Sequence, residues 1–171
     1  MDAQIERKGR KMTGFSVNIE QATEDNDFFR QVLYTGSDFM IIDFEGEPAR
    51  PLAERRQKRS ALQDVAGMLR SFHYAAYAAF FEQVTGGLQP SDVETFTQYW
   101  HRWVSVAYLQ SYLEIARSAA FLPQSDGELR TLLDAYLLEK AVYELGYELN
   151  NRPDRVKNPL QGILQTLQAV Q

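Results

Sequence analysis

The chain has 171 residues, of which 44% are hydrophobic and 24% are charged, a composition typical of one globular domain. Its 18 lysines and arginines and its 23 aspartates and glutamates give a net charge of −5, which disfavours nucleic acid and anionic membranes as partners. The absence of cysteine excludes disulfides, thiolate metal sites and thiol nucleophiles, and it favours a cytoplasmic location. No apolar run is long enough to cross a bilayer, and the first residues do not resemble a secretory signal.

A β-hairpin is predicted over residues 31–43. The residues before it are polar and charged without a clear period, so we expect a leader or loop there. Two β-prone runs then follow, and between them lies a short segment that contains Gly36 and Asp38. Glycine adopts the positive φ of a tight turn at little cost, and aspartate makes local hydrogen bonds there. Gly46 and Pro48 end the second strand.

The rest of the chain is predicted to be helical. The expected helices span about residues 61–84, 91–120, 126–150 and 159–169. Ser91 with Glu94, and Ser125 with Glu128, have the spacing of a capping box, in which the serine side chain accepts a hydrogen bond from the third backbone amide. The sequence therefore predicts a mainly α fold in which a short hairpin precedes an antiparallel array of helices.

Three carboxylates follow the second predicted strand at alternate positions, Asp43, Glu45 and Glu47. In an extended segment they would project to one side. Carboxylates on one side can hold Mg²⁺, which prefers oxygen ligands. The alternative is a solvated loop after a hairpin, and the spacing alone favours this alternative.

A second group lies on the predicted helix over residues 126–150. Lys140, Tyr143 and Tyr147 have the i, i+3, i+7 spacing of one helix face, and Tyr136 extends the same stripe. Aromatic rings with a polar tip, next to an ammonium donor, suit a sugar with its apolar C–H surfaces and hydroxyl rims. The alternative is an amphipathic helix that packs its tyrosines at the edge of the core, and the spacing alone favours it.

The remaining candidates have ordinary structural explanations. His73 and His101 fall on different predicted helices, and neither has a second histidine at i+3 or i+4, which disfavours a zinc site. Trp100 and Trp103 are expected in the core. The basic residues between positions 50 and 59 are expected to form a solvated linker.

Six segments of the chain resemble the maltokinase family, in the C-terminal lobe of its aminoglycoside-phosphotransferase-like kinase fold. They are residues 31–36, 38–48, 50–56, 64–72, 138–145 and 147–153. The same region is similar to the kinase-like part fused to some bacterial trehalose synthases. The resemblance implies that Mg²⁺ and ATP are the cofactors and maltose the substrate. The implied reaction gives ADP and maltose 1-phosphate, which supplies α-glucan synthesis.

The resemblance also implies roles for individual residues. Asp43 matches the metal-binding aspartate at the end of the hairpin, and Gln31 matches a metal-side amide that closes the catalytic loop. Both would orient Mg²⁺ on the phosphates of the nucleotide. Lys140, Tyr143 and Tyr147 match positions that hold the maltose in this family.

The chain departs from the family in the catalytic loop. The eight residues that end at Gln31 read Glu-Asp-Asn-Asp-Phe-Phe-Arg-Gln, where the family has His-Gly-Asp-Tyr-His-Leu-Gly-Gln. Asn26 therefore stands where an aspartate acts as general base, and an amide cannot accept the proton. Asp25 and Asp27 flank this position, and their substitution for the base is speculative. We expect no intact catalytic residue.

A kinase of this type also needs an N-terminal lobe that holds ATP, and we expect residues 1–30 to be a divergent leader in place of that lobe. Three readings of the function stay open. The chain is the acceptor-binding half of a maltokinase completed by a separate N-lobe, or a non-catalytic module that binds sugar or docks on trehalose synthase, or a nonfunctional fragment. The missing base favours the last two. Without an N-lobe, the apolar floor of the nucleotide cleft would be exposed, and such a surface would favour a homodimer.

Overall fold

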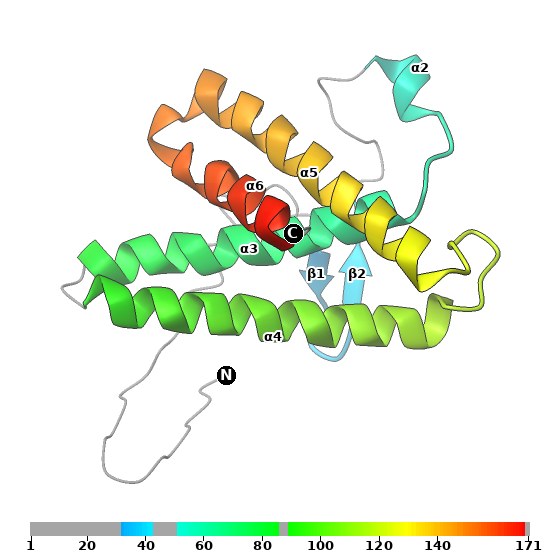
Figure 1. Cartoon of the computed structure of the whole chain (residues 1–171), viewed down its shortest axis with the longest axis horizontal. Coiled ribbons are helices and arrows are strands. Elements are labelled where there is room, and N and C mark those ends of the chain that lie inside the picture. The colour runs from blue at the N-terminus through cyan, green and yellow to red at the C-terminus, as the bar shows by residue number, and fades with distance from the viewer. Residues whose placement is uncertain (1–31, 43–50, 86–88, 170–171) are drawn as a thin grey trace, which may run out of the picture.

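The computed structural model describes residues 32–42, 51–85 and 89–169. Its elements are β1 (Val32–Tyr34), β2 (Phe39–Ile41), α2 (Leu52–Arg55), α3 (Leu62–Thr85), α4 (Pro90–Ala116), α5 (Asp126–Asn151), the 3-10 helix η2 (Pro153–Arg155) and α6 (Lys157–Ala169). This part of the chain is mainly helical, with a two-stranded antiparallel hairpin (Figure 1). The predicted class is confirmed at this level. None of the described helices is long and apolar enough to span a membrane.

The hairpin forms as its turn residues predict. Leu33 lies opposite Met40 in the antiparallel register. Gly36 has a φ of 96°, a conformation that costs little only without a side chain. The backbone N–H of Thr35 donates to the carbonyl oxygen of Asp38 at 2.8 Å, and the backbone N–H of Asp38 donates to the Thr35 hydroxyl at 3.1 Å. The turn is therefore closed by bonds among its own residues.

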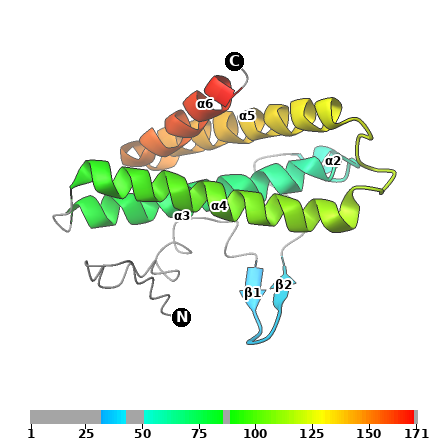
Figure 2. The same cartoon turned by 60° about the horizontal axis from the view of Figure 1, so that its bottom comes forward.

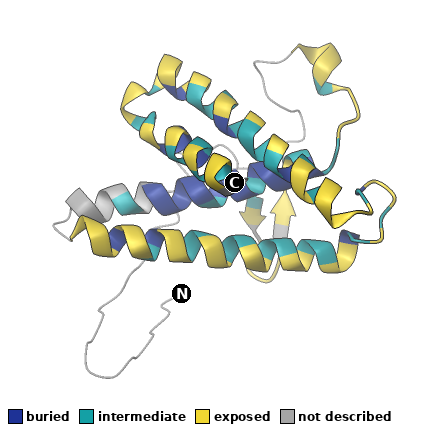
Figure 3. Cartoon of the chain, in the orientation of Figure 1, coloured by how far each residue is buried: buried dark blue, intermediate teal, exposed yellow. Residues whose placement is uncertain are grey.

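Helix α3 is the centre of the helical part. It packs against α4, α5 and α6. Residues 62–77 of α3 are mostly buried, and Figure 3 shows much of the helix in dark blue between neighbours with exposed outer faces. Leu62, Val65, Leu69, Phe72 and Ala76 lie on one face of this helix at helical spacing. Ala66, His73 and Tyr77 are also buried, so the buried surface is wider than that one face. A helix with neighbours on several sides must bury more than one stripe.

The apolar core lies where α3, α4 and α5 meet. Its buried residues are Leu62, Val65, Ala66, Leu69, Ala116, Leu122 and Leu133. Partly buried residues of α4 and α5, among them Tyr108, Leu132 and Tyr136, pack against this cluster. One face of α5 therefore packs on the core, and it carries Leu129, Leu132, Leu133, Tyr136 and Leu137.

The ends of α4 differ from the prediction. The helix begins at Pro90, after Gln89, which makes no side-chain cap. The expected capping box of Ser91 and Glu94 is therefore wrong, because proline at the first helical position already has the φ that a helix needs. The helix ends at Ala116 instead of near residue 120.

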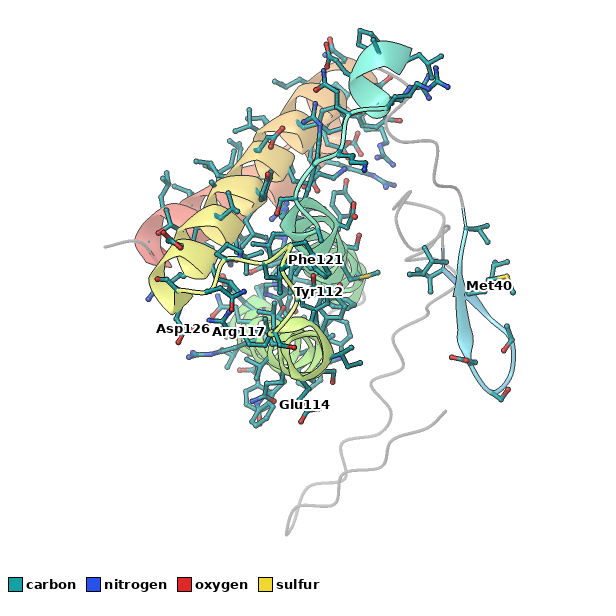
Figure 4. All side chains as sticks on the ribbon, turned by 90° about the vertical axis from the view of Figure 1, so that its right-hand side faces the viewer. Met40, Tyr112, Glu114, Arg117, Phe121 and Asp126 are labelled. Carbon is teal, nitrogen blue, oxygen red and sulfur yellow. The ribbon has the colours of Figure 1, made fainter. Side chains whose placement is uncertain are left out.

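The turn between α4 and α5 is closed by Arg117. Its guanidinium donates to the carbonyl oxygens of Pro123 at 2.8 Å and Gln124 at 2.6 Å, and to Asp126 at 2.7 Å. Figure 4 labels Arg117 and Asp126 side by side at this end of the helices. The next helix begins as predicted, because the side chain of Ser125 accepts a hydrogen bond from the backbone N–H of Glu128.

Two features were not expected. A short helix, α2, lies in the basic segment for which the sequence predicts a solvated linker. In addition, the hairpin and the α5–α6 pair lie on opposite sides of the layer formed by α3 and α4 (Figure 2). Figure 4 shows the same separation from another direction, with Met40 on the far side of α3 and α4 from α5.

Candidate functional site

The candidate site is a stripe along one edge of α5, formed by Lys140, Tyr143 and Tyr147. Helix α5 buries Leu133, Ala141 and Glu148, and the stripe lies beside this buried face. Lys140 and Tyr143 are half-buried, whereas the Tyr147 side chain is 41% exposed. The three residues share one side of the helix, as their spacing predicts, but that they bind sugar stays a prediction.

Both tyrosine rings of the stripe have a cation next to them. The Nζ atom of Lys140 lies 5.1 Å from the centroid of the Tyr143 ring. The guanidinium carbon of Arg152 lies 5.3 Å from the centroid of the Tyr147 ring. Both distances are within the range in which a cation is attracted to the π electrons of a ring. These contacts restrict how the two rings can turn.

A buried ion pair lies beneath the stripe. The Nη2 and Nε atoms of Arg70, on α3, donate to Oε2 of Glu144 at 2.6 and 3.0 Å. The Arg70 side chain is only 4% exposed, and that of Glu144 is 16% exposed. Neither charge can be left unpaired at this depth without a large loss of solvation energy.

Glu148 forms a second buried centre one turn further along α5. Its carboxylate accepts hydrogen bonds from the Tyr74 hydroxyl at 2.5 Å and from Nε and Nη2 of Arg152 at 3.1 and 2.9 Å. Burial and the neighbouring Glu148 carboxylate raise the pKa of Tyr74 well above its ordinary value. The phenol therefore stays protonated and donates to the carboxylate at any physiological pH.

These two centres fix the rotation of α5 on α3. Arg70 and Tyr74 are one turn apart on α3, as are Glu144 and Glu148 on α5. Because the two hydrogen-bonded contacts lie one turn apart on both helices, α5 can form both of them in only one rotation about its own axis. This rotation places the stripe at the edge of the α3–α5 pair. The sequence alone did not predict this role. One sequence feature could have indicated it: Glu144 and Glu148 fall at positions that the helical period assigns to the apolar face of α5.

Helix α6 closes over Arg70. A Cβ atom at Gly162 would lie 1.8 Å from Nη1 of Arg70, so only glycine permits this approach. The amides of Gln161 and Gln165 donate to the Tyr77 hydroxyl at 2.9 and 3.0 Å. The interior between α3 and α6 is therefore polar and hydrogen-bonded.

The two histidines meet in the interior. The ring centroids of His73 and His101 are 5.1 Å apart, and His73 is 2% exposed. Burial lowers the pKa of His73 well below its ordinary value, with Arg70 and His101 acting in the same direction. Burial and Arg70 lower the pKa of His101 to about 4. Both rings are therefore neutral near pH 7. Within the described ranges, no three His, Cys, Asp or Glu side chains gather closely enough to hold a metal ion.

The expected position of Trp103 is wrong. Its side chain is 55% exposed and meets Tyr99 edge-on, with the ring centroids 6.0 Å apart. Trp100 is half-buried. None of the described helices covers the outer side of α4 (Figure 1), and Tyr99 and Trp103 are exposed there.

The residues that the resemblance assigns to catalysis and metal binding lie outside the described residues. They are Asp25, Asn26, Asp27, Gln31 and Asp43, and the neighbouring Glu45 and Glu47 also lie outside. The strand before Asp43 is described, and it lies across the α3–α4 layer from α5 (Figure 2). The described structure therefore does not bring the stripe next to the hairpin.

No protein-family model matches the chain. The similarity of six segments to the maltokinase family therefore remains a prediction. Those segments contain Arg70, Glu144, Glu148 and Arg152, which pair with one another or with a neighbour in the interior. Part of the resembling pattern thus has a structural role that requires no ligand.

Proposed function

We propose that the chain is a maltokinase-like C-lobe whose α5 binds maltose or a similar disaccharide, and that its own residues do not transfer phosphate. The observation that carries this proposal is the stripe, in which two tyrosine rings, each next to a cation, share one edge of α5. The match of these three positions to the maltose-holding positions of the family supports the same conclusion.

The geometry of the stripe suits two linked sugar rings. Tyr143 and Tyr147 are four residues apart, which corresponds to a rise of about 6 Å along the helix axis. One aromatic ring per sugar unit is a natural arrangement, because each ring offers an apolar surface and a phenolic hydroxyl. Lys140 adds a donor for a sugar hydroxyl. The fixed rotation of α5 on α3 lowers the entropy lost on binding.

Phosphate transfer needs more than this stripe. The acceptor hydroxyl, the metal-bound phosphates and a general base must meet in one place. Asn26 occupies the position of the base, and the hairpin that leads to Asp43 lies across the α3–α4 layer from α5 (Figure 2). Both observations support binding without catalysis. Mg²⁺ and ATP are thus cofactors of the family reaction rather than of the function proposed for α5.

The hairpin supports a second candidate function, docking on another polypeptide such as a nucleotide-binding N-lobe or trehalose synthase. Leu33, Met40 and Ile41 are 49, 55 and 59% exposed. A two-stranded hairpin is marginally stable alone and gains stability when another surface covers its apolar side chains. A second copy of this chain, which would give the homodimer, is another outcome of the same test.

Titration calorimetry separates these functions. We expect saturable heat when maltose is added to the chain without nucleotide, and no heat and no ADP release when ATP and Mg²⁺ follow. Tyr143→Ala and Lys140→Met should each weaken maltose binding about fivefold, since each removes one contact worth about 1 kcal/mol. Ala135→Ser, on the exposed outer side of α5, is the matched control and should bind as the unmodified chain does.

The outcome that contradicts sugar binding is the absence of maltose heat with a correctly folded chain. Formation of maltose 1-phosphate by the chain alone would contradict the absence of catalysis. If phosphate transfer occurs only after another polypeptide is added, the docking function gains support, and light scattering of the mixture shows whether a complex forms.

A further inference from the structure

Arg152 lies at the end of α5, where the chain leaves the helix. Its backbone N–H donates to the carbonyl oxygen of Glu148 at 2.8 Å, and its φ of −146° and ψ of 69° are outside the helical region. Pro153 follows, and a proline disfavours helical dihedrals in the residue before it. The backbone of Arg152 is therefore fixed at this corner, and its side chain turns back along α5.

The side chain of Arg152 is fixed as well. Its guanidinium makes two hydrogen bonds to the Glu148 carboxylate, and this carboxylate, 2% exposed, also accepts the Tyr74 hydroxyl. A planar guanidinium can make such a two-point bond and lie against an aromatic ring at the same time. The Arg152 side chain keeps 31% exposure, so it lies at the boundary between the interior and solvent.

Tyr147 is the most exposed member of the stripe, and it has Arg152 against its ring at 5.3 Å. We propose that Arg152 is a positioning residue: anchored on Glu148, it holds the Tyr147 ring in the orientation that stacks on one sugar ring of the disaccharide. This inference rests on the proposed sugar binding by α5. According to this inference, the affinity for sugar depends partly on the buried carboxylate of Glu148, which does not contact the sugar.

The test measures two quantities, the affinity for maltose and the NMR signals of the Tyr147 ring. Arg152→Met keeps the length of the side chain but removes its charge and both hydrogen bonds. We expect it to weaken maltose binding about fivefold, the effect of losing an exposed cation–π contact and the order it imposes. Tyrosine-labelled NMR spectra without sugar should show shifted Tyr147 ring signals. Arg152→Lys should recover only part of the affinity, because an ammonium cannot make the two-point bond.

Two further variants separate positioning from folding. Arg130→Met removes the same charge from an exposed position near the start of α5 and should bind maltose as the unmodified chain does. The double variant Glu148→Gln with Arg152→Met leaves no unpaired buried charge, so it should fold while still showing the weakened binding and the shifted ring signals.

Unchanged maltose affinity in Arg152→Met and in the double variant would overturn this inference while leaving sugar binding intact. Unshifted Tyr147 signals in both variants would also overturn it. If the unmodified chain does not bind maltose, the proposed function fails and this inference fails with it.

Discussion

The β1–β2 hairpin is held by hydrogen bonds among its own residues, whereas α3 and α5 are joined by side chains 74 residues apart in the sequence. The hairpin exposes Leu33, Met40 and Ile41, but the α3–α5 interface buries Arg70 and Glu148. Substitutions should therefore change the free energy of unfolding by very different amounts in the two regions. An exposed apolar residue of the hairpin contributes little to folding, while a buried charge of the interface contributes much through its partner.

The largest effect is expected from Arg70→Met. It leaves Glu144 without its buried partner, so the free energy of unfolding should fall by about 3–5 kcal/mol. Urea denaturation followed by circular dichroism measures this change. Arg130→Met is the matched control, because Arg130 is 69% exposed and lies 3.8 Å from Asp134; exposed pairs contribute less than about 1 kcal/mol. Equal losses in the two variants would contradict the importance of the interface.

Acid should weaken the contact between α3 and α4, where the rings of His73 and His101 meet. The pKa of His101 is lowered to about 4 in the folded chain, and that of His73 is lowered as well. Between pH 6.5 and 4 the unfolded chain therefore binds more protons, so stability falls as the pH falls. At about 1.4 kcal/mol per pKa unit, His101 alone accounts for about 3 kcal/mol over this range.

This pH dependence is measured by denaturation at several pH values. His101→Gln keeps a polar side chain but does not titrate, so its stability should fall less steeply below pH 6.5. An equally steep fall in this variant would show that other groups cause the acid sensitivity.

A smaller effect should follow from Gly162→Ala. The added methyl would meet the Arg70 guanidinium at 1.8 Å, and such overpacking costs about 1–3 kcal/mol. Gly146→Ala is the matched control on α5. A Cβ atom there meets nothing within 4 Å, and alanine favours a helix, so this variant should gain about 0.5–1 kcal/mol. Thermal unfolding should show a lower melting temperature for Gly162→Ala and a higher one for Gly146→Ala. This difference would confirm that α6 approaches Arg70 closely at Gly162.

The smallest change in stability is expected in the hairpin. Met40 is 55% exposed, so Met40→Thr should change the free energy of unfolding by less than about 0.5 kcal/mol. If the hairpin docks on another polypeptide, the same variant should weaken the complex, which light scattering detects. Leu69→Ala, in the buried core, serves as the contrast and should cost about 2–5 kcal/mol. A large loss in Met40→Thr would mean that the helices depend on the hairpin.

The sequence predicted the local features well. Gly36 indicated the turn of the hairpin, Ser125 indicated the start of α5, and the helical period placed Lys140 and Tyr147 on one face. Each of these depends on residues within a few positions of one another. The start of α4 was predicted to within one residue, but its cap was predicted wrongly, because proline at position 90 prevailed over the serine that follows it.

The amino-acid sequence by itself determined the hairpin and the four long helices, their order, and which side chains share a face of α5, since backbone geometry and side-chain spacing are local properties. Only the tertiary structure decided which faces are covered. It buried α3 on several sides, left Trp103 in solvent, and paired Arg70 with Glu144. A charged residue at a core position becomes stabilising or destabilising according to its partner, and that partner comes from a distant part of the chain.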